Sequence, residues 1–149
     1  MRIGRYAFEY CTSLTSVTIP QSVREIGYGA FKNCVSLKEI TLPETLSLLE
    51  SCVFENCASL ERVVFPETAK EVPPGTFKNC TSLREAVLAA ETETALEAAF
   101  SGCTNLQALG AVKGFGFLLR HPVIIITCRG QHQILTGSLV HTPVSYTHL

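Results

Sequence analysis

The seven cysteines are the side chains of this 149-residue chain with the most potential for metal or redox chemistry. Five of them recur with a spacing of 23 residues: Cys11, Cys34, Cys57, Cys80 and Cys103. No two cysteines have the C-x-x-C spacing of a zinc ribbon. Side chains stacked in one column point the same way, which is poor geometry for a disulfide bond. We therefore interpret the column as small buried side chains, a common role of free cysteine, and predict no metal ligands.

The histidines and serines form no catalytic pattern. All four histidines lie after residue 120, without the close spacing of metal ligands on one helix face: His121, His132, His141 and His148. The chain has no G-x-S-x-G nucleophile elbow, no G-x-G-x-x-G turn and no phosphate-binding loop. The sequence therefore predicts no catalytic residue and no cofactor, and a protein that is not an enzyme.

The charges argue against two classes of partner. The formal charge is −1, whereas nucleic-acid and anionic-membrane binders usually carry a large basic excess. The apolar run Val123 to Ile126 is far too short to span a bilayer. We expect neither nucleic-acid binding nor membrane insertion by this segment.

Apolar residues repeat through most of the chain with a period of 23 residues and no insertion. Phenylalanine occupies positions 8, 31, 54, 77 and 100, and leucine occupies positions 14, 37, 60, 83 and 106. A fixed period of this length is typical of a solenoid, in which each unit buries its apolar face against its neighbours. We therefore predict five stacked copies of one 23-residue unit.

Each copy contains one clear strand signal. Val17 and Ile19 alternate with polar residues and should face inward, and Pro20 ends the strand because proline cannot extend a ladder. The following segment returns through turns or a short second strand. The fourth return segment, from Ala86 to Phe100, lacks the proline and should form a helical turn. Stacking places the short parallel strands on one concave face of a mainly β or α/β-repeat solenoid.

The outward rows of these strands carry the candidate binding residues. Charges alternate in sign along two rows, so unlike charges on neighbouring strands should lie within reach of one another. A third row adds exposed threonine and valine. A solvated, self-neutralised sheet face and a protein-binding face are both compatible with this pattern. The candidate residues are Lys38, Glu39, Thr41, Glu61, Arg62, Val64, Arg84, Glu85 and Val87.

The repeat does not continue to the end of the chain. A sixth copy requires Phe, Cys and Leu at positions where the sequence has Val123, Ile126 and Arg129. We therefore assign residues 1–112 to the array, incomplete at its N-terminus, and residues 113–149 to a non-repeat tail. This tail has no acidic residue. It is either a short cap over the last coil or sequence foreign to the protein.

The repeat resembles a known family over about residues 3 to 112. The residues that carry the resemblance are Ile26-Gly27-x-x-Ala30-Phe31-x-Asn33-Cys34-x-Ser36-Leu37-x-x-Ile40-x-Leu42-Pro43. This pattern looks like the BspA-type leucine-rich repeat. The resemblance implies a right-handed curved solenoid without catalytic residues, and a role in bacterial surface proteins that adhere to host or matrix proteins.

We therefore expect a non-enzymatic protein-binding scaffold, part of a cell-surface or secreted adhesin. The chain opens inside a repeat and has no apolar leader, which suggests a fragment of a longer protein. One alternative is a structural spacer within a larger surface protein. Another is a cytoplasmic protein–protein interaction module, because abundant unpaired cysteine favours a reducing compartment.

Overall fold

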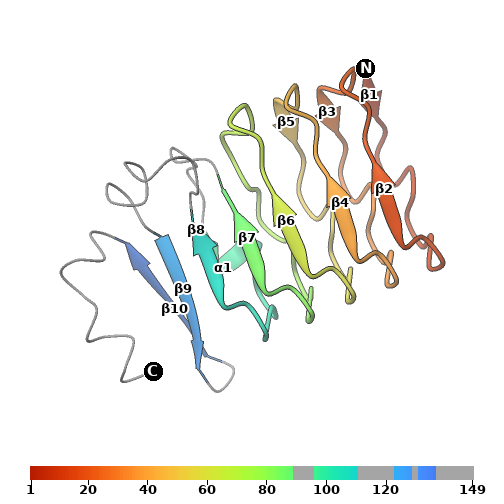
Figure 1. The fold of residues 1–149 in the computed structure, drawn as a ribbon. Coiled ribbons are helices and arrows are strands. Elements are labelled where there is room, and N and C mark those ends of the chain that lie inside the picture. Colours follow the sequence, from red (N-terminus) through yellow and green to blue (C-terminus); the bar gives the residue numbers. More distant parts are fainter. Residues whose placement is uncertain (89–95, 111–122, 129–130, 137–149) are drawn as a thin grey trace.

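The computed structural model of the chain describes residues 1–88, 96–110, 123–128 and 131–136. Five short strands lie side by side along one face (Figure 1), one from each copy of the repeat. They are β2 (Ser16–Thr18), β4 (Glu39–Thr41), β6 (Arg62–Val64), β7 (Glu85–Val87) and β8 (Ala108–Gly110). They form one parallel sheet in the order β2-β4-β6-β7-β8. The predicted alternation is confirmed, because Ile40 and Val63 are buried while the residues on either side of them are exposed.

The opposite side of the first coils forms a second parallel sheet, which we call the return sheet. It has the order β1-β3-β5 and consists of β1 (Arg2–Ile3), β3 (Glu25–Ile26) and β5 (Leu48–Leu49). Glu50 N–H extends this ladder by donating to the oxygen of Ile26. The equivalent residue of the next coil is Pro73, which has no N–H to donate. The return sheet therefore ends where Pro73 and Pro74 enter the array.

A short helix replaces the return strand in the last copy. Helix α1 (Leu96–Ala99) has four residues and lies on the side away from β7 and β8 (Figure 1). The helical turn predicted between Ala86 and Phe100 is thus present at its C-terminal end, while residues 89–95 lie outside the described residues.

The core runs as columns of side chains through the whole stack. The phenylalanine rings of successive copies are nearly parallel, with centroids 5.1, 5.7, 5.5 and 5.1 Å apart from Phe8 to Phe100. The leucine column beside them is buried from Leu37 to Leu106. Each coil therefore packs its largest side chains onto the same side chains of the next coil.

Two further strands lie beyond the repeats, β9 (Val123–Cys128) and β10 (Gln131–Thr136). They pair in antiparallel fashion as a hairpin, and β9 lies beside β8 (Figure 1). The predicted end of the array, at residue 112, lies outside the described residues. Both interpretations of residues 113–149, a cap or foreign sequence, remain predictions. In the described part of the chain, no helix has the length and apolar character needed to cross a bilayer.

Candidate functional site

The turns that lead into the exposed sheet are built on asparagines. Asn33, Asn56 and Asn79 have φ angles of 60–62°, in the left-handed region that asparagine tolerates better than most residues. Asn56 Nδ2 donates to Asn33 Oδ1 at 2.7 Å, and Asn79 Nδ2 donates to Asn56 Oδ1 at 3.0 Å. The asparagines thus form a hydrogen-bonded ladder from coil to coil. The last copy has Gly102 at this position, also with positive φ.

Each of the first four coils has a second residue in the left-handed region, which was not predicted from the sequence. Tyr6, Gly29, Cys52 and Gly75 are spaced by 23 residues and all have φ between 56° and 73°. The two glycines were the available signal, because glycine marks positions where the backbone needs positive φ. This column explains the additional Cys52, which stands at a turn position and not in the core.

The buried cysteines act as internal hydrogen-bond donors. The thiols of Cys34, Cys57, Cys80 and Cys103 donate to phenylalanine carbonyl oxygens of the preceding coil at 3.0–3.2 Å. Burial raises the pKa of the Cys34 thiol to about 11 and also raises the pKa of Cys57. The cysteines of residues 1–110 are all free. The interpretation of the column as buried thiols is confirmed for these four residues, whereas Cys11 in the first copy is half-buried. The buried thiols are poor nucleophiles because only the thiolate reacts.

The parallel sheet brings most of the candidate binding residues onto one surface, which we call the strand face. Seven of the nine are exposed: Lys38, Glu39, Thr41, Glu61, Arg62, Val64 and Arg84. Glu85 is half-buried. Whether the strand face binds a partner stays a prediction.

The expectation that Val87 lies in an exposed row is wrong, because only 9% of this residue is exposed. Val87 is the last residue of β7, and it is paired with Val64 of β6 on one side and with Gly110 of β8 on the other. Val64, by contrast, is 41% exposed. It is paired on the Val87 side alone, because the pairing of β4 with β6 is restricted to Glu39 and Arg62.

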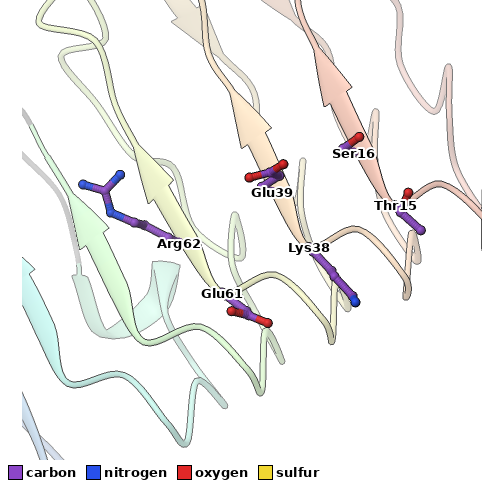
Figure 2. A pocket seen from close by; sticks show the side chains of 6 residues that line it. All are labelled: Thr15, Ser16, Lys38, Glu39, Glu61 and Arg62. Carbon is purple, nitrogen blue, oxygen red and sulfur yellow. The ribbon is translucent and has the colours of Figure 1, made fainter.

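The charges on the strand face neutralise one another less than the alternating signs predicted. The described residues of this face form one ion pair, in which Arg62 Nε lies 2.7 Å from Glu85 Oε2. Figure 2 shows Arg62 extending away from Glu39, although Glu39 is its direct partner in the sheet register. Glu39 is therefore left without an ion pair in the described part of the chain.

Two shallow grooves cross the strand face. The first has a volume of about 580 Å³, and Figure 2 shows its lining, which is Thr15, Ser16, Lys38, Glu39, Glu61 and Arg62. The second, of about 340 Å³, lies over the ends of β4 and β6 and is lined by Glu39, Ile40, Thr41, Leu42, Glu44, Arg62, Val64 and Pro66. The grooves share Glu39 and Arg62, so they form one continuous depression across three coils.

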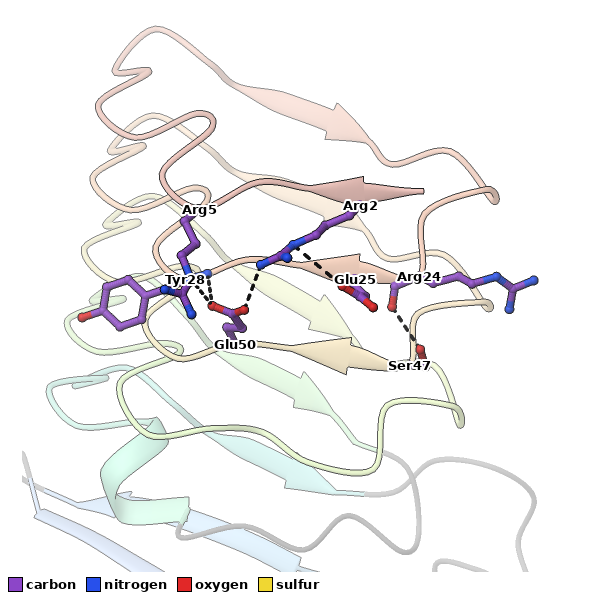
Figure 3. Close-up of polar contacts among 7 residues, drawn as sticks. All are labelled: Arg2, Arg5, Arg24, Glu25, Tyr28, Ser47 and Glu50. Carbon is purple, nitrogen blue, oxygen red and sulfur yellow. Dashed lines mark hydrogen bonds and ion pairs between the residues drawn. The ribbon is translucent and has the colours of Figure 1, made fainter.

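On the return sheet, one carboxylate joins residues from three coils. Glu50 accepts hydrogen bonds from Arg2 at 3.1 Å, from Arg5 at 2.9 Å and from the Tyr28 N–H at 2.9 Å (Figure 3). The hydrogen bond from Tyr28 is the main cause of a lowered pKa of the Glu50 carboxyl, followed by Arg5. This carboxylate connects the first three coils, and the hydrogen bonds that it accepts come from residues of this chain.

No group of three or more potential metal ligands occurs in the described ranges. The chemistry that the described surface offers is hydrogen bonding, charge pairing and apolar contact, which are the elements of protein recognition.

Three solved structures of bacterial repeat proteins resemble the chain. A leucine rich repeat protein of T. pallidum is 34% identical with a TM-score of 0.69, over 72% of this chain and 50% of its own. A leucine rich cell surface protein of Faecalibacterium prausnitzii A2-165 is 33% identical with a TM-score of 0.72, over 78% of this chain and 31% of its own. A leucine-rich repeat protein of Bacteroides ovatus ATCC 8483 is 29% identical with a TM-score of 0.54, over 73% of this chain and 34% of its own. The chain thus spans half or less of the length of each.

No curated protein is similar enough to the chain to count as a match. The family model of the BspA type leucine rich repeat region, which has six copies, matches residues 1–115. Its repeat count is slightly higher than the five members of the phenylalanine column. The match covers more than three quarters of the chain. The chain belongs to the BspA-type leucine-rich repeat family.

Proposed function

We propose that this chain is a non-enzymatic protein-binding scaffold, and that its strand face makes the contact. The observation that carries the proposal is the in-register stacking of β2, β4, β6, β7 and β8. This stacking repeats equivalent outward positions along one surface, and repeat proteins use such extended surfaces to bind partners.

The strand face has suitable chemistry for a protein partner. Arg62 and Val64 are exposed on the same face of β6, on either side of the buried Val63. Arginine and apolar anchors carry much of the binding energy at protein interfaces. Positive and negative side chains are equal in number among the candidate residues: Lys38, Arg62 and Arg84 against Glu39, Glu61 and Glu85. This balance disfavours nucleic acid, which requires a basic excess.

We further propose that the scaffold belongs to a longer bacterial protein of the cell surface and binds host or matrix proteins. The structural neighbour from Faecalibacterium prausnitzii, which is described as a cell surface protein, supports the location. The proposed partner rests on the family's usual role.

The experiment is a binding assay of the full chain against immobilised matrix proteins, with serum albumin as the blank. The test variant is Arg62→Glu with Val64→Glu on the strand face. The matched control is Arg24→Glu with Leu48→Glu on the return sheet, where Arg24 is exposed and Leu48 is 47% exposed. Both variants make the same type of change to one arginine and one aliphatic residue.

We expect the strand-face variant to weaken binding at least about tenfold, in line with the loss of one strong contact, and the return-sheet variant to bind normally. The opposite result would move the site to the return sheet. A chain that binds no matrix or surface protein would be the structural spacer.

A further inference from the structure

The strand face has one break in its hydrogen bonding, between β4 and β6. At the ends of the flanking strand pairs, Ile19 N–H donates to the Thr41 oxygen and Phe65 N–H donates to the Val87 oxygen. The corresponding bond between β4 and β6 would join Leu42 N–H to the Val64 oxygen, and the structure has no such bond. The Cα register of this pair stops at Glu39 and Arg62. The two strands thus separate toward their C-terminal ends.

The smaller groove lies at this separation. Leu42 and Val64, whose backbone groups lack each other as partners, both line it. A backbone carbonyl without a donor is an acceptor available to a ligand. The exposed side chain of Val64 and the methyl group of Thr41 supply apolar contact on the same groove.

The unsatisfied charge at this groove is negative. Glu39 and Glu44 are exposed, and neither carboxylate has an ion pair or hydrogen bond among the described residues. The third charged residue of the lining, Arg62, is paired with Glu85. A ligand in this groove would therefore meet three acceptor groups, which are the carboxylates of Glu39 and Glu44 and the Val64 oxygen. The donors are fewer, since they are the Leu42 N–H and an arginine that is already paired with Glu85.

We infer that this groove receives a lysine or arginine side chain of the protein partner. The inference rests on the proposed function and names the chemistry of one contact within it. The aliphatic stem of such a side chain lies along Val64 and Thr41, since long basic side chains cover apolar surface with their methylene groups. Its cationic head pairs with Glu39 or Glu44 and donates to the Val64 oxygen, as charge-assisted hydrogen bonds favour.

The test uses small probes of one basic side chain, so it does not depend on knowing the partner. Butylguanidinium and butylammonium are titrated into the isotope-labelled full chain, and amide chemical shifts are recorded by NMR. Butanol and butyrate, which have the same alkyl chain, are the neutral and anionic controls. We expect saturable shifts of the Leu42 and Val64 amides with the two cations only.

A variant then tests the carboxylates. Glu39→Gln with Glu44→Gln should weaken cation binding at least about tenfold, because a charge-assisted hydrogen bond is lost. Glu25→Gln with Glu71→Gln removes the same charge from positions that line neither groove and should leave binding unchanged.

Three outcomes would overturn the inference. Equal shifts with butanol would show an apolar site, and shifts with butyrate would show an anion site at Arg62 and Leu42. The absence of shifts with any probe would show that the groove is not a binding site. These outcomes are distinct from failure of the proposed function. A matrix protein that binds the strand face equally well after Glu39→Gln with Glu44→Gln would leave the proposed function in place and refute only the contact with a basic side chain.

Discussion

At the scale of single residues, the repeat separates positions that hold the stack from positions that face solvent. Phe54 is fully buried between the rings of Phe31 and Phe77. Lys38 is exposed on the strand face and has no ion pair in the described part of the chain. The two residues are the clearest pair for testing the inside and outside of a coil.

Phe54→Ala should lower the free energy of unfolding by about 3–5 kcal/mol, the usual range for a buried aromatic residue. Lys38→Ala should lower it by less than about 1 kcal/mol, because an exposed charge contributes little. Urea denaturation followed by circular dichroism measures both. Equal losses in the two variants would show that the assignment of core and surface is wrong.

The cysteine thiols also divide into buried and accessible groups. Cys34, Cys57 and Cys80 are buried, with pKa values raised mainly by burial, whereas Cys11 and Cys52 are half-buried. Iodoacetamide at pH 8 should therefore modify Cys11 and Cys52 in the native chain and reach the buried three only after unfolding, because the reagent needs an accessible thiolate. Peptide mass spectrometry identifies the modified sites, and fast native labelling of Cys57 would refute the prediction.

At the scale of elements, the turns determine how one strand is placed on the next. Asn56 is the middle rung of the asparagine ladder, and it combines a φ of 61° with hydrogen bonds to both neighbouring rungs. Asn56→Ala loses the hydrogen bonds and places an alanine in the left-handed region, while Asn56→Gly loses only the hydrogen bonds.

We predict that the alanine variant is less stable than the glycine variant by about 1–2 kcal/mol, the cost of the left-handed conformation for an ordinary residue. This is the reverse of the usual order of alanine and glycine. The free energy of unfolding of both variants decides the question, and a more stable alanine variant would remove the role assigned to the turn.

The return sheet predicts a pH dependence. Because the pKa of Glu50 is lowered in the folded chain, its ionised form stabilises the fold at pH values above the unfolded pKa of about 4.3. This contribution is lost as the pH falls through the lower pKa of the folded chain.

Glu50→Gln should therefore lower the Tm at pH 7 and make the loss of Tm between about pH 5 and pH 3 smaller than in the unmodified chain. Thermal melts across this range test both effects, with Glu71→Gln, an exposed carboxylate outside the cluster, as the control. A Tm of Glu50→Gln that equals that of the control at every pH would show that the carboxylate does not tie the coils together.

At the scale of the whole molecule, the 23-residue period was enough to predict the stack, its parallel strands and the core columns. Each coil repeats the same residues, so one strand and one return segment describe all the others. The site was predicted less completely, because it depends on differences between coils. Arg62 had a glutamate on either neighbouring strand, and the alternating signs could not show that it pairs with Glu85 and leaves Glu39 without an ion pair.

The burial of Val87 and the separation of β4 from β6 were missed for the same reason. Both follow from how far each strand pair keeps its register, which is a property of the assembled stack. The return sheet also depends on partners from three coils, since Glu50 joins Arg2, Arg5 and Tyr28.

We place partner binding on the strand face, and photo-crosslinking can test this placement. The photoreactive residue p-benzoylphenylalanine replaces Thr41 on the strand face or Ser47 on the return side, both of which are exposed. Each full-length variant is illuminated with the matrix protein that binds in the assay above. We expect a crosslinked complex from position 41 and none from position 47, whereas a complex formed from position 47 alone would move the binding site to the return side.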